Sequence, residues 1–355
     1  MTRILIDDKI PYLHGQAEQL GCCTYMPGAR ISPADVKDKD VLIVRTRTRC
    51  DAALLQGSSV RLVVTATSGY DHLDVEWLQQ AGIAWRCCPA SNAMSVVQYV
   101  ITTLLRLHLM ERLDLTAATV GIVGVGNIGS RLASSLSGLG VRTLLCDPPR
   151  AEKGEAGLVG MNELISQSDV ITFHTPLTHN GPHATYHLAG AHFFDLCRER
   201  RPIVINAARG GVVDEELLLR ALCDGTVREA VIDTWQTEPS TDRELRDRCL
   251  IATPHIAGYS ADGKANATRM SLQAVAEWLG TDIAFEVEPP QIDPSFAYNT
   301  EQPPVTEALR YYDPLFDSNR FKAAPMQFEQ QRGTYPLRRE CPLTRENVFS
   351  PLKLK

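Results

Sequence analysis

Three residues whose side chains can exchange or stabilise a proton follow apolar segments in the second half of the chain: Arg209 in INAARGGVVDEE, Glu238 in DTWQTEP and His255 in TPHIAGYS. An imidazole can take up a hydroxyl proton near neutral pH, and a neighbouring carboxylate stabilises its charged form. A guanidinium offers the planar pair of donors that a substrate carboxylate and a developing carbonyl need. Together these side chains suit the oxidation of a 2-hydroxy acid. Their spacing alone leaves open that each is a loop residue satisfied locally.

A glycine-rich loop upstream is predicted to bind a dinucleotide. The pattern G-x-G-x-x-G stands between an apolar strand and a helical segment, and its members are Gly124, Gly126, Asn127, Ile128 and Gly129. In this pattern the first glycine makes a tight turn, the second lets the backbone approach a pyrophosphate, and the third lets helix and strand pack closely. The glycines alone would also fit an ordinary tight turn.

The acid that follows this loop favours NAD as the cofactor. Asp147 comes 18 residues after Gly129, at the end of the next apolar segment. A carboxylate at this position can accept hydrogen bonds from the adenosine ribose hydroxyls. It would repel the 2′-phosphate of NADP, although Arg150, three residues further on, weakens this preference slightly.

The elements that must position these residues alternate between short apolar runs and helical patterns, which is typical of an α/β architecture with parallel sheets. A first series of strands is predicted at 3–7, 41–46, 61–66 and 83–88. A second series is predicted at 119–124, 142–147, 169–175, 202–208, 229–235 and 250–255. One long helical segment, 95–114, lies between the two series and lacks Gly and Pro.

Two strand series separated by one helix predict two doubly wound parallel-sheet domains. We expect a flavodoxin-like substrate (lid) domain at 1–94, completed by 257–280, and a Rossmann NAD-binding domain at 95–256 that starts with the hinge helix. Residues 281–355 begin with a segment rich in Pro and acids, and are predicted to be a linker followed by a small C-terminal extension.

The bulk composition excludes several classes of protein. The chain has 36 Lys+Arg against 42 Asp+Glu, a net charge of −6, which argues against nucleic-acid binding. We expect no membrane association, because no apolar run approaches the roughly eighteen residues needed to span a bilayer, and the N-terminus does not read as a signal peptide. The 10 cysteines are scattered and lack a C-x-x-C pair, as in a reduced, cytoplasmic protein.

The run HNGPHATYHLAGAH first suggests a metal site, with His179, His183, His187 and His192. However, the Gly-Pro pair at 181–182 breaks any helix that would align the first two histidines. We therefore predict that no metal is bound there.

The motifs GIVGVGNIG, INAARGGVVDEEL, DTWQTEP and TPHIAGYS resemble those of the D-2-hydroxyacid dehydrogenase family, over most of residues 1–280. Longer strings, VTATSGYDHLD and TFHTPLTHNGPHATYHL, resemble a branch of this family whose substrate carries a phosphate. The resemblance implies that Arg209 and Glu238 are catalytic residues and that His255 is the proton donor or acceptor. It also implies a homodimer formed through a C-terminal domain, although the tail matches that domain only weakly.

The resemblance further implies a set of binding residues. NAD contacts are expected at Asp147, Thr175, Asp233 and Gly258. Substrate contacts are expected at Thr46, Thr67 and Tyr259.

The stretch VLIVRTRTRC, residues 41–50, places Arg45, Arg47 and Arg49 after an apolar strand. They are either the solvated tip of a strand or part of an anion site. In an extended chain they would lie on one side. Given the implied phosphate, we expect Arg45 and Arg49 to contribute charge to its site, and Arg47 to be solvated. A protein with a negative net charge can bind an anion in this way, because the local electrostatic field at the site, and not the net charge, determines binding.

The sequence therefore predicts NAD-dependent oxidation of a small phosphorylated 2-hydroxy acid at C2. Within the same class, another small 2-hydroxy acid, such as 3-phosphoglycerate or glycerate, is the alternative substrate. An NAD-sensing binding protein is the alternative from a different class, because this fold also serves proteins that read nucleotide state.

Overall fold

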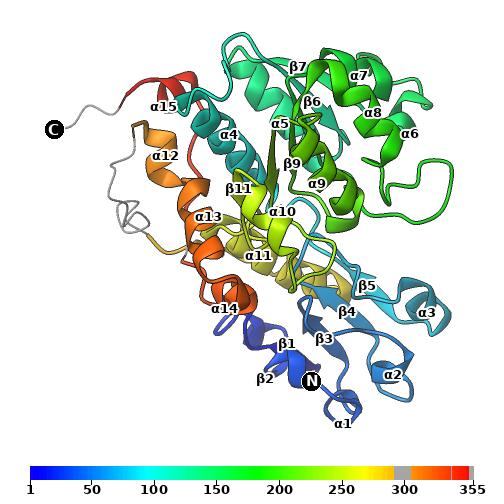
Figure 1. Ribbon diagram of the computed structural model, residues 1–355. Coiled ribbons are helices and arrows are strands. Elements are labelled where there is room, and N and C mark those ends of the chain that lie inside the picture. Colours follow the sequence, from blue (N-terminus) through cyan, green and yellow to red (C-terminus); the bar gives the residue numbers. More distant parts are fainter. Residues whose placement is uncertain (292–304, 337, 352–355) are drawn as a thin grey trace. The chain divides into compact units, whose positions relative to one another are not determined.

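The structure is a computed structural model that describes residues 1–291, 305–336 and 338–351. The chain forms two compact units, each with its own parallel sheet (Figure 1). The first unit comprises Met1–Asn92 and Ser260–Gln291. The second comprises Ala93–Tyr259 and the described part of Ile292–Lys355. Within the described ranges, no helix is long and apolar enough to cross a bilayer.

The first unit is a five-stranded sheet with helices on both faces. Its strands are β1 (Arg3–Asp7), β2 (Cys22–Met26), β3 (Val41–Val44), β4 (Leu62–Thr65) and β5 (Ala84–Arg86). Its helices are η1 (Ala17–Gln19), η2 (Gly28–Arg30), α1 (Pro33–Val36), α2 (Ala52–Leu55), α3 (Val75–Gln80) and α11 (Ala261–Leu279). The order β2-β1-β3-β4-β5, all parallel, is the flavodoxin-like order.

Strand alternation divides the first unit into two cores. Successive side chains of a strand point to opposite faces, so Ile4 and Ile43 enter the core that α11 covers, while Leu5 and Leu42 enter the core that α2 and α3 cover. Near-continuous apolar strands are expected when both faces of a parallel sheet are buried.

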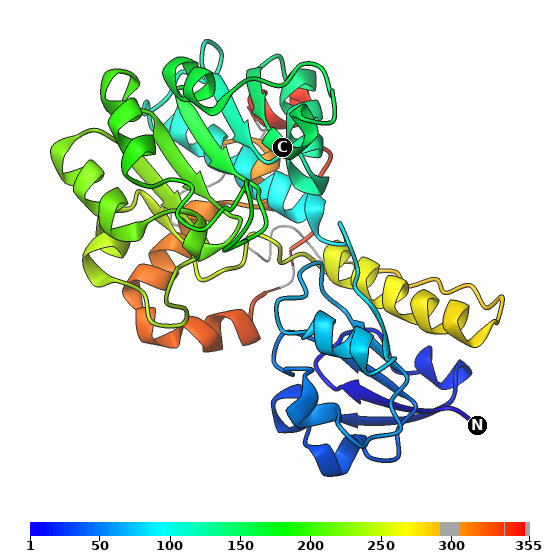
Figure 2. The same cartoon turned by 90° about the vertical axis from the view of Figure 1, so that its right-hand side faces the viewer.

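The second unit is a six-stranded parallel sheet. Its strands are β6 (Thr119–Val123), β7 (Arg142–Cys146), β8 (Val170–Phe173), β9 (Ile203–Asn206), β10 (Glu229–Ile232) and β11 (Ile251–Ala252). Its helices up to residue 259 are α4 (Ala93–Leu109), α5 (Asn127–Gly138), α6 (Pro148–Ala151), α7 (Met161–Gln167), α8 (Ala191–Arg200), η3 (Gly210–Val212), α9 (Glu215–Asp224) and α10 (Arg243–Arg248). Helices cover both faces (Figure 2): α4 and α5 pack on one core and α7, α8 and α9 on the other.

The strand order of the second unit, β11-β10-β9-β8-β6-β7, confirms the predicted Rossmann class. A single parallel bridge between Leu145 of β7 and Leu158 occupies the place of the usual third Rossmann strand. The chain reverses direction across the sheet between β6 and β8, which pair with each other. Ligands bind at such a switch point, beyond the carboxyl ends of the strands.

The predicted strands extended further than the observed ones, and the excess residues form the loops of the site. The segment predicted at 250–255 contains only the two-residue β11, and the segment predicted at 202–208 ends as a strand at Asn206. Strand β2 was not predicted, because its residues CCTYM are largely half-exposed and carry no clear alternation. The hinge helix α4 ends at Leu109 rather than 114, and Glu111 follows with a left-handed φ of 58°, which is typical of a helix end.

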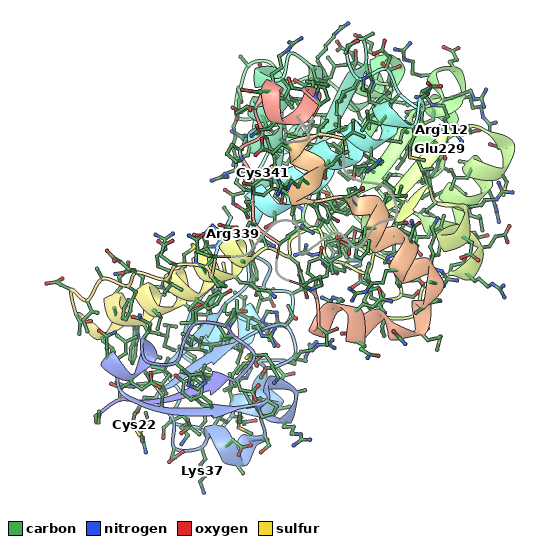
Figure 3. All side chains as sticks on the ribbon, turned by 90° about the vertical axis from the view of Figure 1, so that its left-hand side faces the viewer. Cys22, Lys37, Arg112, Glu229, Arg339 and Cys341 are labelled. Atoms are coloured by element: carbon green, nitrogen blue, oxygen red, sulfur yellow. The ribbon has the colours of Figure 1, made fainter. Side chains whose placement is uncertain are left out.

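The C-terminal residues form a helical extension on the second unit. They comprise α12 (Glu307–Tyr311), α13 (Pro314–Ala323), η5 (Pro325–Gln327), α14 (Phe328–Gly333) and α15 (Arg345–Phe349). Tyr312 joins the core beside α4, and Phe321 joins the core on the opposite face. The backbone of Arg339 accepts a hydrogen bond of 3.1 Å from the Gln98 side chain in α4; Arg339 and Cys341 are labelled in Figure 3.

Candidate active site

The imidazole of His255 and the carboxylate of Glu238 form a hydrogen-bonded pair on loops that follow β11 and β10. His255 Nδ1 lies 2.8 Å from Glu238 Oε2, and Glu238 Oε1 accepts a hydrogen bond of 2.8 Å from the Trp235 N–H. A carboxylate only accepts, so Nδ1 carries the hydrogen and Nε2 keeps the lone pair that can take up a substrate proton. The two side chains are 33% and 23% exposed, so the pair is shielded from water but remains accessible.

The surroundings of Glu238 keep its carboxyl group ionised. Burial by itself would raise its pKa. The hydrogen bond and charge of His255, together with the Trp235 N–H, outweigh burial and lower the pKa below the ordinary value. At neutral pH the carboxylate is therefore negative, and it stabilises the imidazolium that forms when His255 takes up a proton.

A buried carboxylate, that of Asp233, organises the backbone around His255. Its Oδ1 accepts hydrogen bonds from the Thr253 hydroxyl at 2.7 Å and the Ile256 N–H at 2.8 Å, and its Oδ2 accepts one from the Ala257 N–H at 3.0 Å. The His255 N–H donates to the backbone oxygen of Asp233 at 2.8 Å. These bonds hold His255 at a left-handed φ of 55°, a conformation that survives only where neighbours enforce it.

Asp233 was predicted to contact NAD. The structure places it only 1% exposed, with both carboxylate oxygens engaged within the loop. In the structure it supports the loop that carries His255, and a contact with NAD stays a prediction. Gly258 and Tyr259, the next predicted contacts, follow on the same loop and are half-buried.

The loop after β9 presents Arg209 in extended conformation, with φ −146°. The buried Asn206 side chain closes this loop, because its Nδ2 donates to the Arg209 oxygen at 3.0 Å and its Oδ1 accepts from the Ala208 N–H at 3.2 Å. One guanidinium nitrogen of Arg209 donates to the Ala208 oxygen at 2.9 Å. A guanidinium is a planar group with several donors, the type of group that binds a carboxylate.

A close approach of two backbones locks the Arg209 loop to the Glu238 loop. A Cβ on Gly210 would lie 2.0 Å from the Trp235 oxygen and 2.4 Å from the Gln236 nitrogen. Only glycine fits there. Because β9, β10 and β11 are neighbours in a parallel sheet, Arg209 and the His255–Glu238 pair leave the same edge of the sheet.

The glycines of the 124–129 loop occupy the three positions that a dinucleotide site needs. Gly124 has a φ of 90°, and its Cβ would lie 2.9 Å from the His174 backbone. A Cβ on Gly129 would lie 2.0 Å from the Gly124 oxygen. A Cβ on Gly126 would meet nothing within 4 Å, which leaves space over the N-terminus of α5. That N-terminus has no side-chain cap, so its N–H groups can bind a pyrophosphate.

The acid predicted to bind the ribose is held in place by this loop. Asp147 Oδ2 accepts a hydrogen bond of 2.8 Å from the Val125 N–H, and Asp147 Oδ1 accepts one of 3.2 Å from the Arg150 N–H. The guanidinium of Arg150 is engaged with the Val125 oxygen and with Glu155, whose Oε2 lies 2.5 Å from Nε. Arg150 is therefore occupied by protein groups, which suits NAD better than NADP.

The residues after β8 leave polar atoms that a ligand could satisfy. The Thr175 hydroxyl and His174 Nδ1 are buried and lack a hydrogen-bond partner among the described residues. An unsatisfied buried polar group costs about 1–3 kcal/mol. Burial lowers the pKa of His174 to about 3, so its ring is neutral. Thr175 was a predicted NAD contact, whereas no sequence signal singled out His174.

The arginines of residues 41–50 do not lie on one extended side, because β3 ends at Val44 and the Thr48 N–H donates to the Arg45 oxygen in a turn. Arg45 Nε lies 3.2 Å from Oδ2 of the fully buried Asp7. Arg49 is 74% exposed and pairs with Asp51 at 2.9 Å. Thr46 is exposed between them. Arg45 is thus paired with a fully buried carboxylate, whereas the partner of Arg49 lies at the surface.

Thr67, a predicted substrate contact, belongs to a chain of hydrogen bonds in the first unit. Its hydroxyl donates to the Gly69 oxygen at 2.7 Å and lies 2.6 Å from the Thr65 hydroxyl, which in turn lies 2.9 Å from His72 Nε2. Because the Thr67 hydrogen is used by Gly69, the hydroxyl oxygen can only accept from a ligand in this arrangement.

Two histidines of the 179–192 run pair with different acidic residues. His187 lies 3.1 Å from Asp214, and His183 lies 2.9 Å from Glu152. Within residues 1–291, 305–336 and 338–351, no group of three His, Cys, Asp or Glu side chains is placed to hold a metal ion.

Comparison with known proteins places the chain in a family. A model described as D-isomer specific 2-hydroxyacid dehydrogenase, NAD binding domain, matches residues 99–257. The erythronate-4-phosphate dehydrogenase of Bacteroides thetaiotaomicron is 45% identical over 340 residues, covering 95% of this chain and 97% of that protein. The erythronate-4-phosphate dehydrogenase of Escherichia coli O7:K1 is 40% identical over 350 residues, covering 95% and 92%.

The chain belongs to the erythronate-4-phosphate dehydrogenases, within the D-2-hydroxyacid dehydrogenase family. It is therefore an NAD-dependent dehydrogenase, as predicted. Solved structures share its fold. A D-lactate dehydrogenase from Aquifex aeolicus, complexed with NAD and lactic acid, has a TM-score of 0.64 at 21% identity and covers 79% of this chain and 96% of its own. About a fifth of the present chain has no counterpart in the D-lactate dehydrogenase structure.

The close approach at Gly210 leads to a first prediction. Gly210→Ala should destabilise the second unit by about 1–3 kcal/mol and lower kcat, because the new methyl group can fit only if the Glu238 loop moves. Urea unfolding and steady-state kinetics measure both effects. Gly211→Ala is the matched control, since its Cβ would meet only the side chains of Tyr186 and Leu177, at 3.2 and 3.4 Å. Equal damage from both variants would contradict the explanation.

Glu215, which contacts the loop that carries Glu238, has a raised pKa. Its Oε1 accepts a hydrogen bond of 2.5 Å from the Gln236 N–H. Burial, with smaller contributions from Asp242 and Glu238, raises its pKa to about 7. In the unfolded chain a glutamate titrates near about 4.3. The stabilisation that this group provides is therefore full below that value and is lost as the pH rises through about 7.

Glu215→Gln should therefore flatten the pH dependence of stability. The free energy of unfolding of the wild type, relative to that of the variant, is expected to fall by up to about 3 kcal/mol between pH 4.5 and pH 8. Urea unfolding at both pH values provides the measurement. A difference between the two proteins that does not change with pH would show that Glu215 titrates normally.

Proposed function

We propose that this dehydrogenase oxidises 4-phospho-D-erythronate at C2 to (3R)-3-hydroxy-2-oxo-4-phosphobutanoate, a step in pyridoxal 5′-phosphate biosynthesis. The observation that carries the proposal is the 2.8 Å hydrogen bond between His255 and Glu238, in a chain that belongs to the erythronate-4-phosphate dehydrogenases. The pair provides the base that the reaction requires.

The proposed mechanism divides the reaction between a proton and a hydride. His255 Nε2 takes the proton of the C2 hydroxyl as the carbonyl forms, and the Glu238 carboxylate stabilises the resulting imidazolium. Arg209 binds the substrate carboxylate and the developing carbonyl through its planar donors. The 124–129 loop would hold NAD, which would supply the hydride acceptor for C2. The alcohol loses one proton from oxygen and one hydride from C2, and it becomes a ketone.

The phosphate is proposed to bind at Arg45. Asp7 is fully buried and engages Nε of Arg45, which orients the guanidinium and leaves its two terminal nitrogens for an anion. Thr46 and Thr67 are proposed to contact the remainder of the substrate. Arg49, held by Asp51 at the surface, contributes charge.

Substrate specificity decides between the proposal and its alternatives. With 4-phospho-D-erythronate, 3-phosphoglycerate and glycerate as substrates, we expect the first to give the highest kcat/KM. Preference for either other acid would replace the proposed substrate. Tight NAD binding with no turnover of any 2-hydroxy or 2-oxo acid would instead favour the NAD-sensing protein.

Arg45→Ala should raise KM for 4-phospho-D-erythronate by about 10–100-fold, since a charge-assisted pair with phosphate is lost. The KM for D-erythronate, which lacks the phosphate, should change far less. Arg61→Ala is the control, because Arg61 precedes β4 at the opposite edge of the same sheet and is two-thirds exposed. Equal effects of Arg45→Ala on both substrates would remove Arg45 from the phosphate site.

We further propose that the protein is a cytoplasmic homodimer. The support is the family membership and the cysteines, all ten of which are free, as expected in a reducing compartment. Light scattering of the full-length protein tests the oligomeric state, and a monomer at micromolar concentration would contradict the proposal.

A further inference from the structure

A buried arginine of the C-terminal extension holds the backbone next to the catalytic histidine. Arg338 is 3% exposed, and its Nη2 donates to the Ala257 oxygen at 2.5 Å. Ala257 is two residues after His255, and its N–H is held by Asp233 at 3.0 Å. The N–H of Ala257 is thus held by Asp233, and its backbone oxygen is held by Arg338.

The guanidinium of Arg338 is itself fixed by its neighbours. Its Nη1 donates to the Tyr335 hydroxyl at 2.8 Å, and this hydroxyl donates to Oδ2 of the buried Asp317 at 2.6 Å. The Tyr312 ring lies 3.8 Å from the guanidinium carbon, within range of a cation–π interaction. A cation, a hydroxyl and a carboxylate are hydrogen-bonded in series inside the protein, and such networks favour one arrangement.

The same extension contacts the loop a second time. The Tyr335 ring meets the Tyr259 ring edge to face, with centroids 5.7 Å apart, and the guanidinium of Arg332 lies 5.9 Å from the Tyr259 ring centre. The extension therefore touches the loop at residues 257 and 259, immediately after the proposed base. An error of about 1 Å in the position of such a group can cost about 10²-fold in rate.

We propose that Arg338 is a positioning residue for the dehydrogenase reaction: by holding the Ala257 carbonyl, it keeps His255 in line with Glu238 and makes the C-terminal extension part of the catalytic machinery. The inference rests on the proposed role of His255 as the base. It does not require Arg338 to touch substrate or cofactor.

The test uses the full-length enzyme and three variants of the extension. Arg338→Met removes the hydrogen bond to Ala257 with little loss of volume, and Arg338→Lys keeps one donor and the charge. Arg320→Met is the control within the same extension, because Arg320 donates to the Gln331 oxygen at 3.4 Å and its charge acts on Asp317, so it perturbs the extension without removing the hydrogen bond to Ala257. Steady-state kinetics with 4-phospho-D-erythronate, NADH binding by fluorescence and the melting temperature are measured for each.

We expect Arg338→Met to lower kcat by about 10–100-fold, while KM and the dissociation constant of NADH change less than about threefold. Arg338→Lys should recover part of kcat, and Arg320→Met should keep the wild-type value even if its melting temperature falls. Wild-type kcat in a folded Arg338→Met protein would overturn the inference, as would a loss that Arg320→Met reproduces at equal melting temperature.

If Arg338→Met does not fold, Tyr335→Phe decides the matter, since it removes the hydroxyl that orients the guanidinium and keeps the ring. A lowered kcat with unchanged NADH binding supports the inference, and an unchanged kcat overturns it. The proposed function is tested separately by His255→Asn. If the wild type turns over and His255→Asn does not, the reaction assignment holds whatever the Arg338 variants show.

Discussion

The hydrogen bond between the Glu238 carboxylate and the His255 imidazole is the interaction that the second unit is organised to hold. The partners come from loops after β10 and β11, which pair side by side as parallel strands. The parallel arrangement brings both loops to one edge of the sheet, and the loop of Arg209 leaves the neighbouring β9 at the same edge. One carboxylate then determines that Nδ1 carries the hydrogen, and Nε2 is the nitrogen left with a lone pair.

Backbone contacts, more than side-chain pairs, give this arrangement its precision. Asp233 binds two N–H groups beyond His255, Asn206 closes the loop of Arg209, and Gly210 brings two loops into direct backbone contact. Polar groups buried in this way are costly unless every partner is present. The loop that carries His255 therefore has few alternative positions, which is what the proposed proton transfer over a hydrogen-bond distance requires.

The sequence was sufficient for the fold class, and it singled out the glycine-rich loop and three candidate catalytic residues whose roles stay predictions, because each depends on local patterns. The glycines of G-x-G-x-x-G indicate by themselves where the backbone turns tightly and packs closely. Arg209, Glu238 and His255 each follow an apolar strand. The sequence was not sufficient where a feature depends on distant partners. The contact of Arg338 with Ala257 joins residues 81 positions apart, and the burial of Asp233 follows from loop packing. The sequence also did not show that β3 stops at Val44. The turn that follows removes the strand alternation that would have placed Arg45, Arg47 and Arg49 on one side of the chain.

Glu238 and His255 are proposed to act as one unit, and a double-mutant cycle tests this coupling most directly. kcat/KM for 4-phospho-D-erythronate is measured for the wild type, Glu238→Gln, His255→Asn and the double variant. If the carboxylate works only through the imidazole, the double variant should be no more than about threefold worse than His255→Asn alone. Losses that multiply, so that Glu238→Gln is as damaging without the histidine as with it, would contradict the account.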